Sequence, residues 1–318
     1  MNMEGIYMDS NGSNNHFLKK TLKVVFISLC VLIFALFVLI VALLCFERNS
    51  FSDLGGVEKR EFSCMRDDLD IWGTVFLPAE TNDDHFPIAV VCHEFMANRL
   101  FSFPYAYTLA QNGYAAFCFD FNGGGFFSQS EGKSIDMSVL TEKEDLKAVL
   151  DFAKNQDYTK KGDILLMGCS QGGLVCALTA AEMQDEISGL ILQYPALSIP
   201  DDARKGSMIK AKFDPDNIPD RLNCGPMKLG KQYVTDVIDM NVFQSLAGYT
   251  GDVLLIHGDA DTLVDISYSK EAYQVYQENG ADVGFKVING AGHIFINPSH
   301  IKQSQKYISE FAAEKIRP

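Results

Sequence analysis

One serine of this sequence stands in a setting that suits covalent chemistry. Ser170 lies within residues 168–173 (GCSQGG), after an apolar run and before a stretch of small residues typical of a helix. In a strand–turn–helix setting, the pattern G-x-S-x-G lifts a serine above a sheet on a sharp turn, where bulky neighbours would clash. The first amides of the helix would then face developing negative charge. The alternative is a glycine-rich turn with an incidental serine, but the flanking elements favour a nucleophile.

A serine nucleophile needs a histidine base, and three histidines follow Ser170 in the chain. His293 stands in residues 289–295 (NGAGHIF), a glycine-rich loop just past the last apolar run, which would place it at the same sheet edge as the serine. His257 ends an apolar run, and we expect it to be a buried structural residue. His300 opens the last helix, and we expect it to cap that helix or to face solvent.

The base in turn needs a carboxylate that holds its tautomer, and the order Ser, acid, His places this acid before His293. The loop after His257 contains three candidates, Asp259, Asp261 and Asp265. The residue types alone leave all three open.

The elements that must position these side chains follow from the apolar pattern after about residue 60. Runs that are apolar on both faces suit buried parallel strands, and here they alternate with helical stretches. The expected strands of this kind span 88–92, 115–119, 164–167, 189–193, 253–256 and 285–288. The expected helices span about 102–112, 136–156, 171–184, 267–279 and 299–315. This alternation predicts an α/β fold with a mostly parallel central sheet and helices on both faces.

Other segments complete the expected organisation of the domain. Residues 61–66 and 71–77 alternate in polarity and predict an antiparallel hairpin. Residues 195–249 are irregular and dotted with Pro, Asp, Lys and Gly, so we expect a small cap insertion over the carboxyl edge of the sheet. The catalytic domain is expected to cover 60–318, with a linker at 47–59.

Residues 24–46 form a run of 23 residues without a charge. A helix of that length crosses a hydrocarbon core about 30 Å thick. The run lacks the small-residue cleavage pattern of a signal peptide and the polar stripe of a core helix. We therefore expect one retained transmembrane helix that anchors the chain in a lipid bilayer.

The charges that flank this run indicate its orientation. Lys19, Lys20 and Lys23 precede it, while only Arg48 follows it closely. By the positive-inside rule, residues 1–23 would be a disordered tail in the cytoplasm, and the catalytic domain would lie on the extracytoplasmic side. The expected localisation is a single-pass membrane protein.

Composition excludes several classes of protein. The chain has 27 Lys and Arg against 41 Asp and Glu, a net charge of −14 and a pI near 4.8, which argues against nucleic acid as a partner. Its eight cysteines form no CxxC pair and show no His/Cys spacing of a zinc site. We expect neither a disulfide scaffold nor a metal site.

Five stretches in order resemble motifs of the α/β-hydrolase superfamily, and within it those of feruloyl- and cinnamoyl-esterase-like serine hydrolases. The stretches are residues 93–99 (HEFMANR), 119–124 (FDFNGG), 168–173 (GCSQGG), 257–264 (HGDADTLV) and 290–293 (GAGH). The resemblance covers about residues 60–316 and implies the α/β-hydrolase fold.

This resemblance also implies roles for particular residues. The nucleophile would be Ser170, the acid Asp261 and the base His293. The backbone amides of Phe95 and Gln171 would form the oxyanion hole. The resemblance implies a small-molecule acyl or ester substrate and no metal or organic cofactor.

The sequence departs from the family pattern beside the site. Glu94 stands where the family usually has glycine, which is similar to the oxyanion loop of dienelactone-hydrolase-like enzymes. We expect this carboxylate to turn to solvent or to pair with a cation such as Arg99, because it would otherwise oppose the charge of an oxyanion. Residues 121–125 (FNGGG) lack the histidine of the family's FNGHG. The cap matches poorly, and Tyr233 is a guess for a substrate contact.

Together these features predict a membrane-anchored serine hydrolase that cleaves carboxylic esters or related acyl compounds through an acyl-enzyme. A peptidase or acyl-aminoacyl hydrolase, or a thioesterase or acyltransferase, would use the same three residues. An alternative of another class is a catalytically silent, membrane-tethered binding module, against which the intact set of Ser170, Asp261 and His293 speaks.

Overall fold

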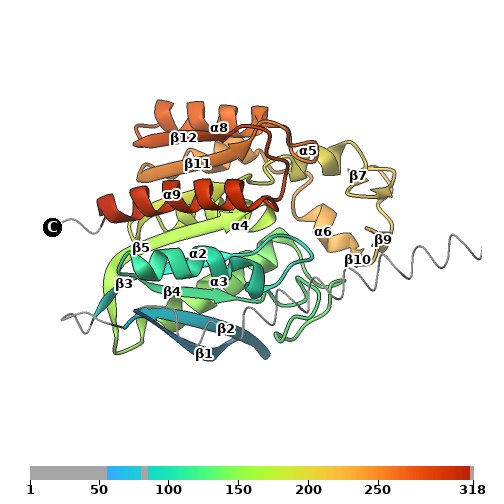
Figure 1. Ribbon diagram of the computed structural model, residues 1–318. Helices are drawn as coiled ribbons and strands as arrows, with labels where there is room; N and C mark the ends of the chain where they lie inside the picture. Colours follow the sequence, from blue (N-terminus) through green and yellow to red (C-terminus); the bar gives the residue numbers. More distant parts are fainter. Residues whose placement is uncertain (1–55, 80–84, 316–318) are drawn as a thin grey trace, which may run out of the picture. The chain divides into compact units, whose positions relative to one another are not determined.

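An eight-stranded sheet organises the residues that the computed structural model describes, 56–79 and 85–315 (Figure 1). The strand order is β1-β2-β4-β3-β5-β6-β11-β12. The strands are β1 (Val57–Arg66), β2 (Leu69–Pro78), β3 (Phe86–Cys92), β4 (Ala115–Phe119), β5 (Thr159–Cys169), β6 (Ile187–Gln193), β11 (Asp252–Gly258) and β12 (Val283–Ile288). β2 pairs antiparallel with β1 and β4, and all the other pairs are parallel.

Burial explains where the strand predictions succeed and where they stop short. Every residue of β4 is buried, as an apolar run inside a sheet that is covered on both faces requires. The predicted hairpin is present, with Arg66 opposite Leu69 across a two-residue turn. Its first strand begins at Val57, so the predicted linker at 47–59 is wrong in its last three residues. Residues 58–60 are exposed on an edge strand and therefore carry no apolar signal.

Helices cover both faces of the sheet and enclose two hydrophobic cores (Figure 1). One face is covered by α2 (Arg99–Gln111) and α9 (Pro298–Lys315). The other is covered by α3 (Val139–Lys154), α4 (Gln171–Glu182) and α8 (Ser267–Glu278). Each of these helices overlaps a predicted one within a few residues at either end. The five helices thus hold the carboxyl ends of the parallel strands at a common edge.

The chain between β6 and β11 departs from the strand–helix alternation, as the irregular composition predicts. It contains α5 (Ile199–Arg204), β7 (Ser207–Met208), β8 (Ala211–Lys212), β9 (Arg221–Asn223), β10 (Lys228–Gly230), α6 (Lys231–Thr235) and α7 (Val242–Leu246). Its strands form two small sheets of two strands each, apart from the main sheet. Ser138, the N-cap of α3, donates a hydrogen bond to Asp236 Oδ2 at 2.5 Å. That bond ties this segment, residues 195–251, to the main domain.

A mostly parallel sheet with helices on both faces, and a nucleophile elbow at the end of its fifth strand, is the α/β-hydrolase fold. Within the described residues, no helix is both long and apolar enough to cross a membrane. The tail, the predicted anchor at 24–46 and most of the predicted linker lie outside the described residues.

Candidate active site

Ser170 stands on a strained turn between β5 and α4. Its backbone has φ 52° and ψ −118°, a conformation that costs free energy in a residue other than glycine. Close packing explains the glycines around it: a Cβ on Gly168 would lie 2.2 Å from the Gly172 carbonyl oxygen, and a Cβ on Gly172 would lie 2.5 Å from the His93 carbonyl oxygen. The turn therefore presses the start of α4 against the loop that follows β3.

Three of the residues singled out in the sequence lie in one line of contacts. Ser170 Oγ is 2.7 Å from Nε2 of His293, which lies in the loop between β12 and α9. His293 Nδ1 is 2.8 Å from Oδ2 of Asp261, which lies in the loop after β11. The side chains of His293 and Asp261 are buried or nearly so, at 10% and 0% exposed. The parallel strands bring these loops to one edge although they are distant in sequence.

Asp261 is held in an ionised state by its hydrogen bonds. Its Oδ1 accepts from the amides of Leu263 and Val264, at 2.8 and 3.0 Å. Burial acts to raise the pKa of Asp261, but the hydrogen bonds from His257, His293 and Val264 together hold that pKa well below its ordinary value. A carboxylate in this state can orient an imidazole and stabilise its positive charge.

The competing aspartates of the same loop make other contacts. Asp259 Oδ1 accepts from the Gly290 amide at 2.6 Å, and Asp265 Oδ1 accepts from the Ser267 amide at 2.8 Å. Both therefore order loop backbone. His300 lies in the first turn of α9, where its amide donates to the Asn297 carbonyl.

His257 is fully buried, as expected, but it also contacts Asp261. Its Nε2 lies 3.0 Å from Asp261 Oδ2. This contact was missed in the sequence, although the spacing of four residues at the end of a strand was visible there.

The loop that carries Phe95 is a tight turn held by His93. The Ala97 amide donates to the Glu94 carbonyl at 3.1 Å, and Met96 takes a positive φ of 64°. His93 Nδ1 donates to the same carbonyl at 2.7 Å, while its Nε2 accepts from the Phe121 amide at 3.2 Å. Burial lowers the pKa of His93, which keeps the ring neutral and lets Nε2 accept.

The second amide expected in the oxyanion hole belongs to Gln171, the first residue of α4. An amide in the first turn of a helix has no carbonyl partner within that helix. The Gln171 side chain donates to Glu142 Oε2 at 2.7 Å and accepts from the Tyr233 hydroxyl. Burial raises the pKa of Glu142 to about 8. Tyr233 itself is 1% exposed, and its role as a substrate contact stays a prediction.

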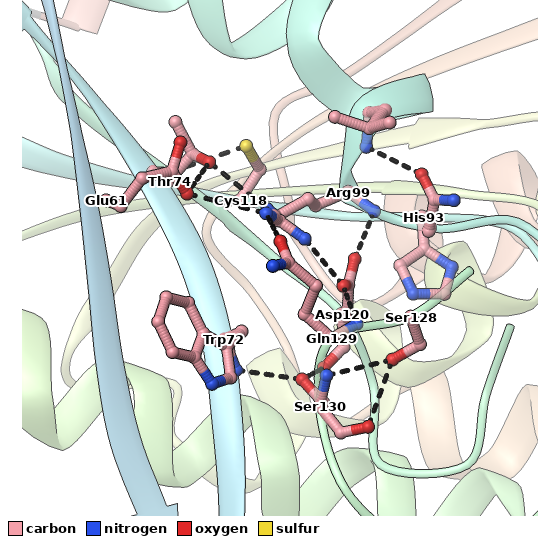
Figure 2. A network of polar contacts seen from close by, with 12 residues as sticks. Glu61, Trp72, Thr74, His93, Arg99, Cys118, Asp120, Ser128, Gln129 and Ser130 are labelled. Carbon is pink, nitrogen blue, oxygen red and sulfur yellow. Dashed lines mark hydrogen bonds and ion pairs between the residues drawn. The ribbon is translucent and has the colours of Figure 1, made fainter. Parts of the chain in front are cut away.

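A buried polar network supports the start of α2 beside this loop (Figure 2). The Arg99 guanidinium donates to Asp120 Oδ2 at 2.7 Å, and the Arg99 amide donates to Asp120 Oδ1 at 2.7 Å. Arg99 also contacts Thr74, Gln129 and Glu61. The side chain of Asp120 is fully buried, so this ion pair joins α2 to the end of β4 in the interior.

The expectation that Glu94 faces solvent or pairs with Arg99 is wrong. Glu94 is 7% exposed, and its Oε1 accepts from the Tyr194 hydroxyl at 2.9 Å. The Arg99 guanidinium is bonded to Asp120 instead, and Tyr194, the first residue after β6, is the partner of Glu94. The Tyr194 ring lies 5.1 Å from the ring of His293, centroid to centroid. The sequence carried no signal for this contact between residues 94 and 194.

No group of three or more His, Cys, Asp or Glu side chains is placed to hold a metal ion in the described part of the chain. The polar groups that lie in contact at Ser170 are a hydroxyl, an imidazole and a carboxylate, a set that suits acyl transfer.

The fold and this site define a hydrolase of the α/β-hydrolase superfamily that works with a serine. The model of the prolyl oligopeptidase family matches residues 100–318, and the chain belongs to that family. A comparison with curated proteins returned no significant match.

Solved structures place the chain near known esterases. Est1E from Butyrivibrio proteoclasticus, solved with bound ferulic acid, is 30% identical with a TM-score of 0.73, covering 80% of this chain and 99% of that one. Esterase Pf2001 from Pyrococcus furiosus is 22% identical with a TM-score of 0.60, covering 81% and 92%. An acylaminoacyl peptidase from Pyrococcus horikoshii is 18% identical with a TM-score of 0.64, covering 83% of this chain and 43% of that one. The protein is a serine hydrolase that resembles feruloyl esterases.

Proposed function

We propose that this protein is an esterase that cleaves carboxylic esters through Ser170, His293 and Asp261. The observation that carries the proposal is the line of contacts from Ser170 Oγ through His293 to Asp261 Oδ2, at 2.7 and 2.8 Å. A base in contact with a hydroxyl, and itself oriented by a carboxylate, turns a weak nucleophile into an effective one.

In the first half of the proposed reaction, His293 Nε2 takes the proton of Ser170 as Oγ attacks the acyl carbon. Asp261 keeps the proton on Nδ1 and stabilises the imidazolium. The proton on Nε2 then passes to the leaving oxygen of the alcohol as the ester C–O bond breaks. The product of this half is an acyl group bound to Ser170 Oγ.

The amides of Phe95 and Gln171 are the proposed donors to the oxyanion of each tetrahedral intermediate. Removing one such donor at comparable sites costs roughly 3–4 kcal/mol of transition-state stabilisation. In the second half, His293 takes a proton from water, the hydroxide attacks the acyl carbon, and Ser170 Oγ regains the proton. The carboxylic acid then leaves.

Esters are the preferred substrate class because the solved structure at 30% identity, which the chain covers almost completely, is an esterase with bound ferulic acid. A peptidase or acylaminoacyl hydrolase is the second candidate, favoured by the description of the matching family. The acylaminoacyl peptidase neighbour is 18% identical and supports the fold alone.

Labelling with a fluorophosphonate probe tests the nucleophile. We expect wild-type protein to be labelled and the Ser170→Ala variant to be folded and unlabelled. Undiminished labelling of that variant would refute the assignment, and absence of labelling in wild type would favour the silent binding module. Unactivated ethyl esters, N-ethyl amides and ethyl thioesters with the same acyl groups then separate esterase, peptidase and thioesterase. Each rate is divided by the uncatalysed rate of the same compound, and we expect the ester to show the largest acceleration.

We further propose that residues 24–46 anchor the protein as a single-pass membrane protein, with the catalytic domain on the extracytoplasmic side. The uncharged run and the lysines before it support this proposal. Fractionation of cells that express the full chain should place it in membranes after an alkaline wash. Protease added outside spheroplasts should degrade the catalytic domain. Amino-terminal sequencing that began near residue 47 would instead reveal a cleaved signal.

A further inference from the structure

A second imidazole contacts the carboxylate of the proposed acid. His257 Nε2 lies 3.0 Å from Asp261 Oδ2, the same oxygen that lies 2.8 Å from His293 Nδ1. His257 is the next-to-last residue of β11 and is 0% exposed. The side chain of Asp261 is also fully buried. The contact is therefore made in the interior, where water does not compete for either partner.

The partners of His257 fix where its proton lies. Nε2 is also 3.2 Å from the Val264 carbonyl oxygen. A carbonyl and a carboxylate can only accept, so Nε2 must carry a hydrogen and donate to both. Nδ1 lies 2.7 Å from Ser269 Oγ on α8, a hydroxyl that can donate to it. In the neutral ring the tautomer is thus the one with hydrogen on Nε2.

We propose that His257 is a positioning residue for Asp261, which it holds with Oδ2 turned toward His293. This inference rests on the function proposed above. The Asp261 carboxylate is then held at both ends, because Oδ1 accepts from the amides of Leu263 and Val264. Rotation about the bond to the carboxyl group would break these bonds and the one from His257 together. The direction left free on Oδ2 is the one that His293 occupies.

The shared oxygen also has an electrostatic consequence. A donor on Oδ2 draws off part of the negative charge that faces His293. Without it, Asp261 would favour the protonated form of His293 more strongly, and the acid limb of the kcat/KM profile would move to higher pH. Among the described residues, other ionisable groups lie near this set. They are Tyr194, whose ring packs against His293, Glu94, which is hydrogen-bonded to Tyr194, Asp259, which bonds the Gly290 amide, and the exposed Asp265. None of these changes when His257 is replaced.

A pair of polar substitutions separates positioning from simple filling of the core. In His257→Gln, the side-chain amide can reach the place of Nε2 and donate to Asp261. In His257→Asn, the shorter amide reaches the place of Nδ1, near Ser269, and leaves Asp261 without this donor. Both variants lose the imidazole ring, and the Asn variant leaves a void larger by one methylene. The unfolding temperature reports this difference in packing, whereas the pH profile reports the loss of the donor to Asp261.

The experiment measures kcat and KM for a p-nitrophenyl ester from pH 5 to 9, on the full chain in detergent, with thermal unfolding as the check of folding. We expect His257→Asn to lower kcat by about 10- to 100-fold with KM changed less than threefold, since a displaced catalytic group costs rates of this order. Its acid limb should move up by about half a pH unit or more. We expect His257→Gln to stay within about fivefold of wild type, with its acid limb unmoved.

Ser269→Ala is the matched control, because it removes the partner of Nδ1 and leaves the donor to Asp261 in place. We expect it to lower kcat less than threefold. Equal losses in the Asn and Gln variants, or an unmoved acid limb in the Asn variant, would overturn the positioning role. A failure of the proposed function is recognised separately, because a wrong nucleophile would show as undiminished fluorophosphonate labelling of Ser170→Ala. If the Asn variant does not fold, the Gln variant tests the proposal. An acid limb that moves by half a pH unit would overturn the proposal. An unmoved acid limb with kcat near that of wild type would support it.

Discussion

The two sides of Ser170 are built in different ways. On the acid side, which carries the proposed acid Asp261, its contacts with His257, Leu263 and Val264 all arise within eight consecutive residues. On the oxyanion side, which carries the proposed donor Phe95, the turn is held by groups that are distant in the chain. Glu94 is bonded to Tyr194, and Arg99 is bonded to Asp120. The acid side is therefore a local device at the end of one strand, whereas the oxyanion side depends on the assembled fold.

The largest effect is expected from breaking the acid side. Asp261→Asn should lower kcat by about 10⁴-fold, because an amide favours the wrong tautomer of His293. The unfolding temperature should also fall, because the hydrogen bonds that hold the pKa of Asp261 well below its ordinary value stabilise the folded state. Steady-state kinetics with Asp259→Asn as control tests this, because Asp259 contacts only loop backbone among the groups described. A comparable loss in the control would shift the role of the acid to Asp259.

Breaking the oxyanion side should affect stability as well as rate. Arg99→Met leaves Asp120 as a buried charge without its ion-pair partner, which typically costs 3–5 kcal/mol of the free energy of unfolding. Urea unfolding measures this loss, and kcat should fall with it as the loop shifts. Arg60→Met, which breaks an exposed pair with Glu58, is the control and should cost at most about 1 kcal/mol. Equal losses in the free energy of unfolding for the two variants would show that burial does not strengthen the Arg99–Asp120 ion pair.

Glu142, which accepts a hydrogen bond from the Gln171 side chain on the oxyanion side, makes the free energy of unfolding depend on pH. Its pKa is raised by burial from 4.5 to about 8, so between these values the folded chain holds a proton that the unfolded chain releases. The free energy of unfolding therefore falls as pH rises through this window, by up to about 1.4 kcal/mol per unit from this group. In Glu142→Gln, the free energy of unfolding should fall less steeply with pH between pH 5 and 8, as urea unfolding at several pH values would measure. Asp145, whose pKa burial raises to about 7, contributes in the same direction in both proteins. Identical slopes would contradict the prediction.

The smallest effect is expected at Glu94. Glu94→Gln keeps an oxygen that can accept from Tyr194, so kcat/KM should stay within about threefold and the pH profile should keep its shape. Tyr194→Phe removes the donor and should cost about 1–3 kcal/mol of stability. A pH–rate profile in which the Gln variant moved the acid limb by a full unit would show that the carboxylate acts on His293 directly.

The same difference between local and long-range contacts explains which features could be predicted from the sequence. Ser170 and its glycines are specified by the steric needs of one turn, and His293 by its place just after a buried strand. Position alone left Asp259, Asp261 and Asp265 open, and the resemblance of residues 257–264 to the family motif favoured Asp261. These signals are local, and the structure brings the three residues into contact. The central strands were predicted for the same reason, because burial on both faces leaves continuous apolar runs.

Features that depend on long-range contacts were missed or placed wrongly. Nothing near Glu94 indicates that the hydroxyl of Tyr194, a hundred residues later, donates a hydrogen bond to its carboxylate. β5 was predicted over 164–167 but begins at Thr159, because its residues 160–163 are exposed and polar. The bond from Tyr233 to Gln171 likewise joins the irregular segment to the elbow across 62 residues. Only the folded chain shows these pairings.

The hydrogen bond from Ser138 to Asp236 sets a population as well as a position. A hydrogen bond to a charged group contributes about 1.5–3 kcal/mol. By itself this bond favours the docked arrangement of residues 195–251 by a factor of about 10 to 150. The segment adds to this bond the packing of Leu197, Leu229 and Tyr249 in the main hydrophobic core, so the docked arrangement is favoured by much more than that factor. A substrate whose entry required the whole segment to lift would therefore find almost no open molecules, and its apparent affinity would fall by that small fraction. We therefore expect the docked segment to limit the size of ester that is turned over.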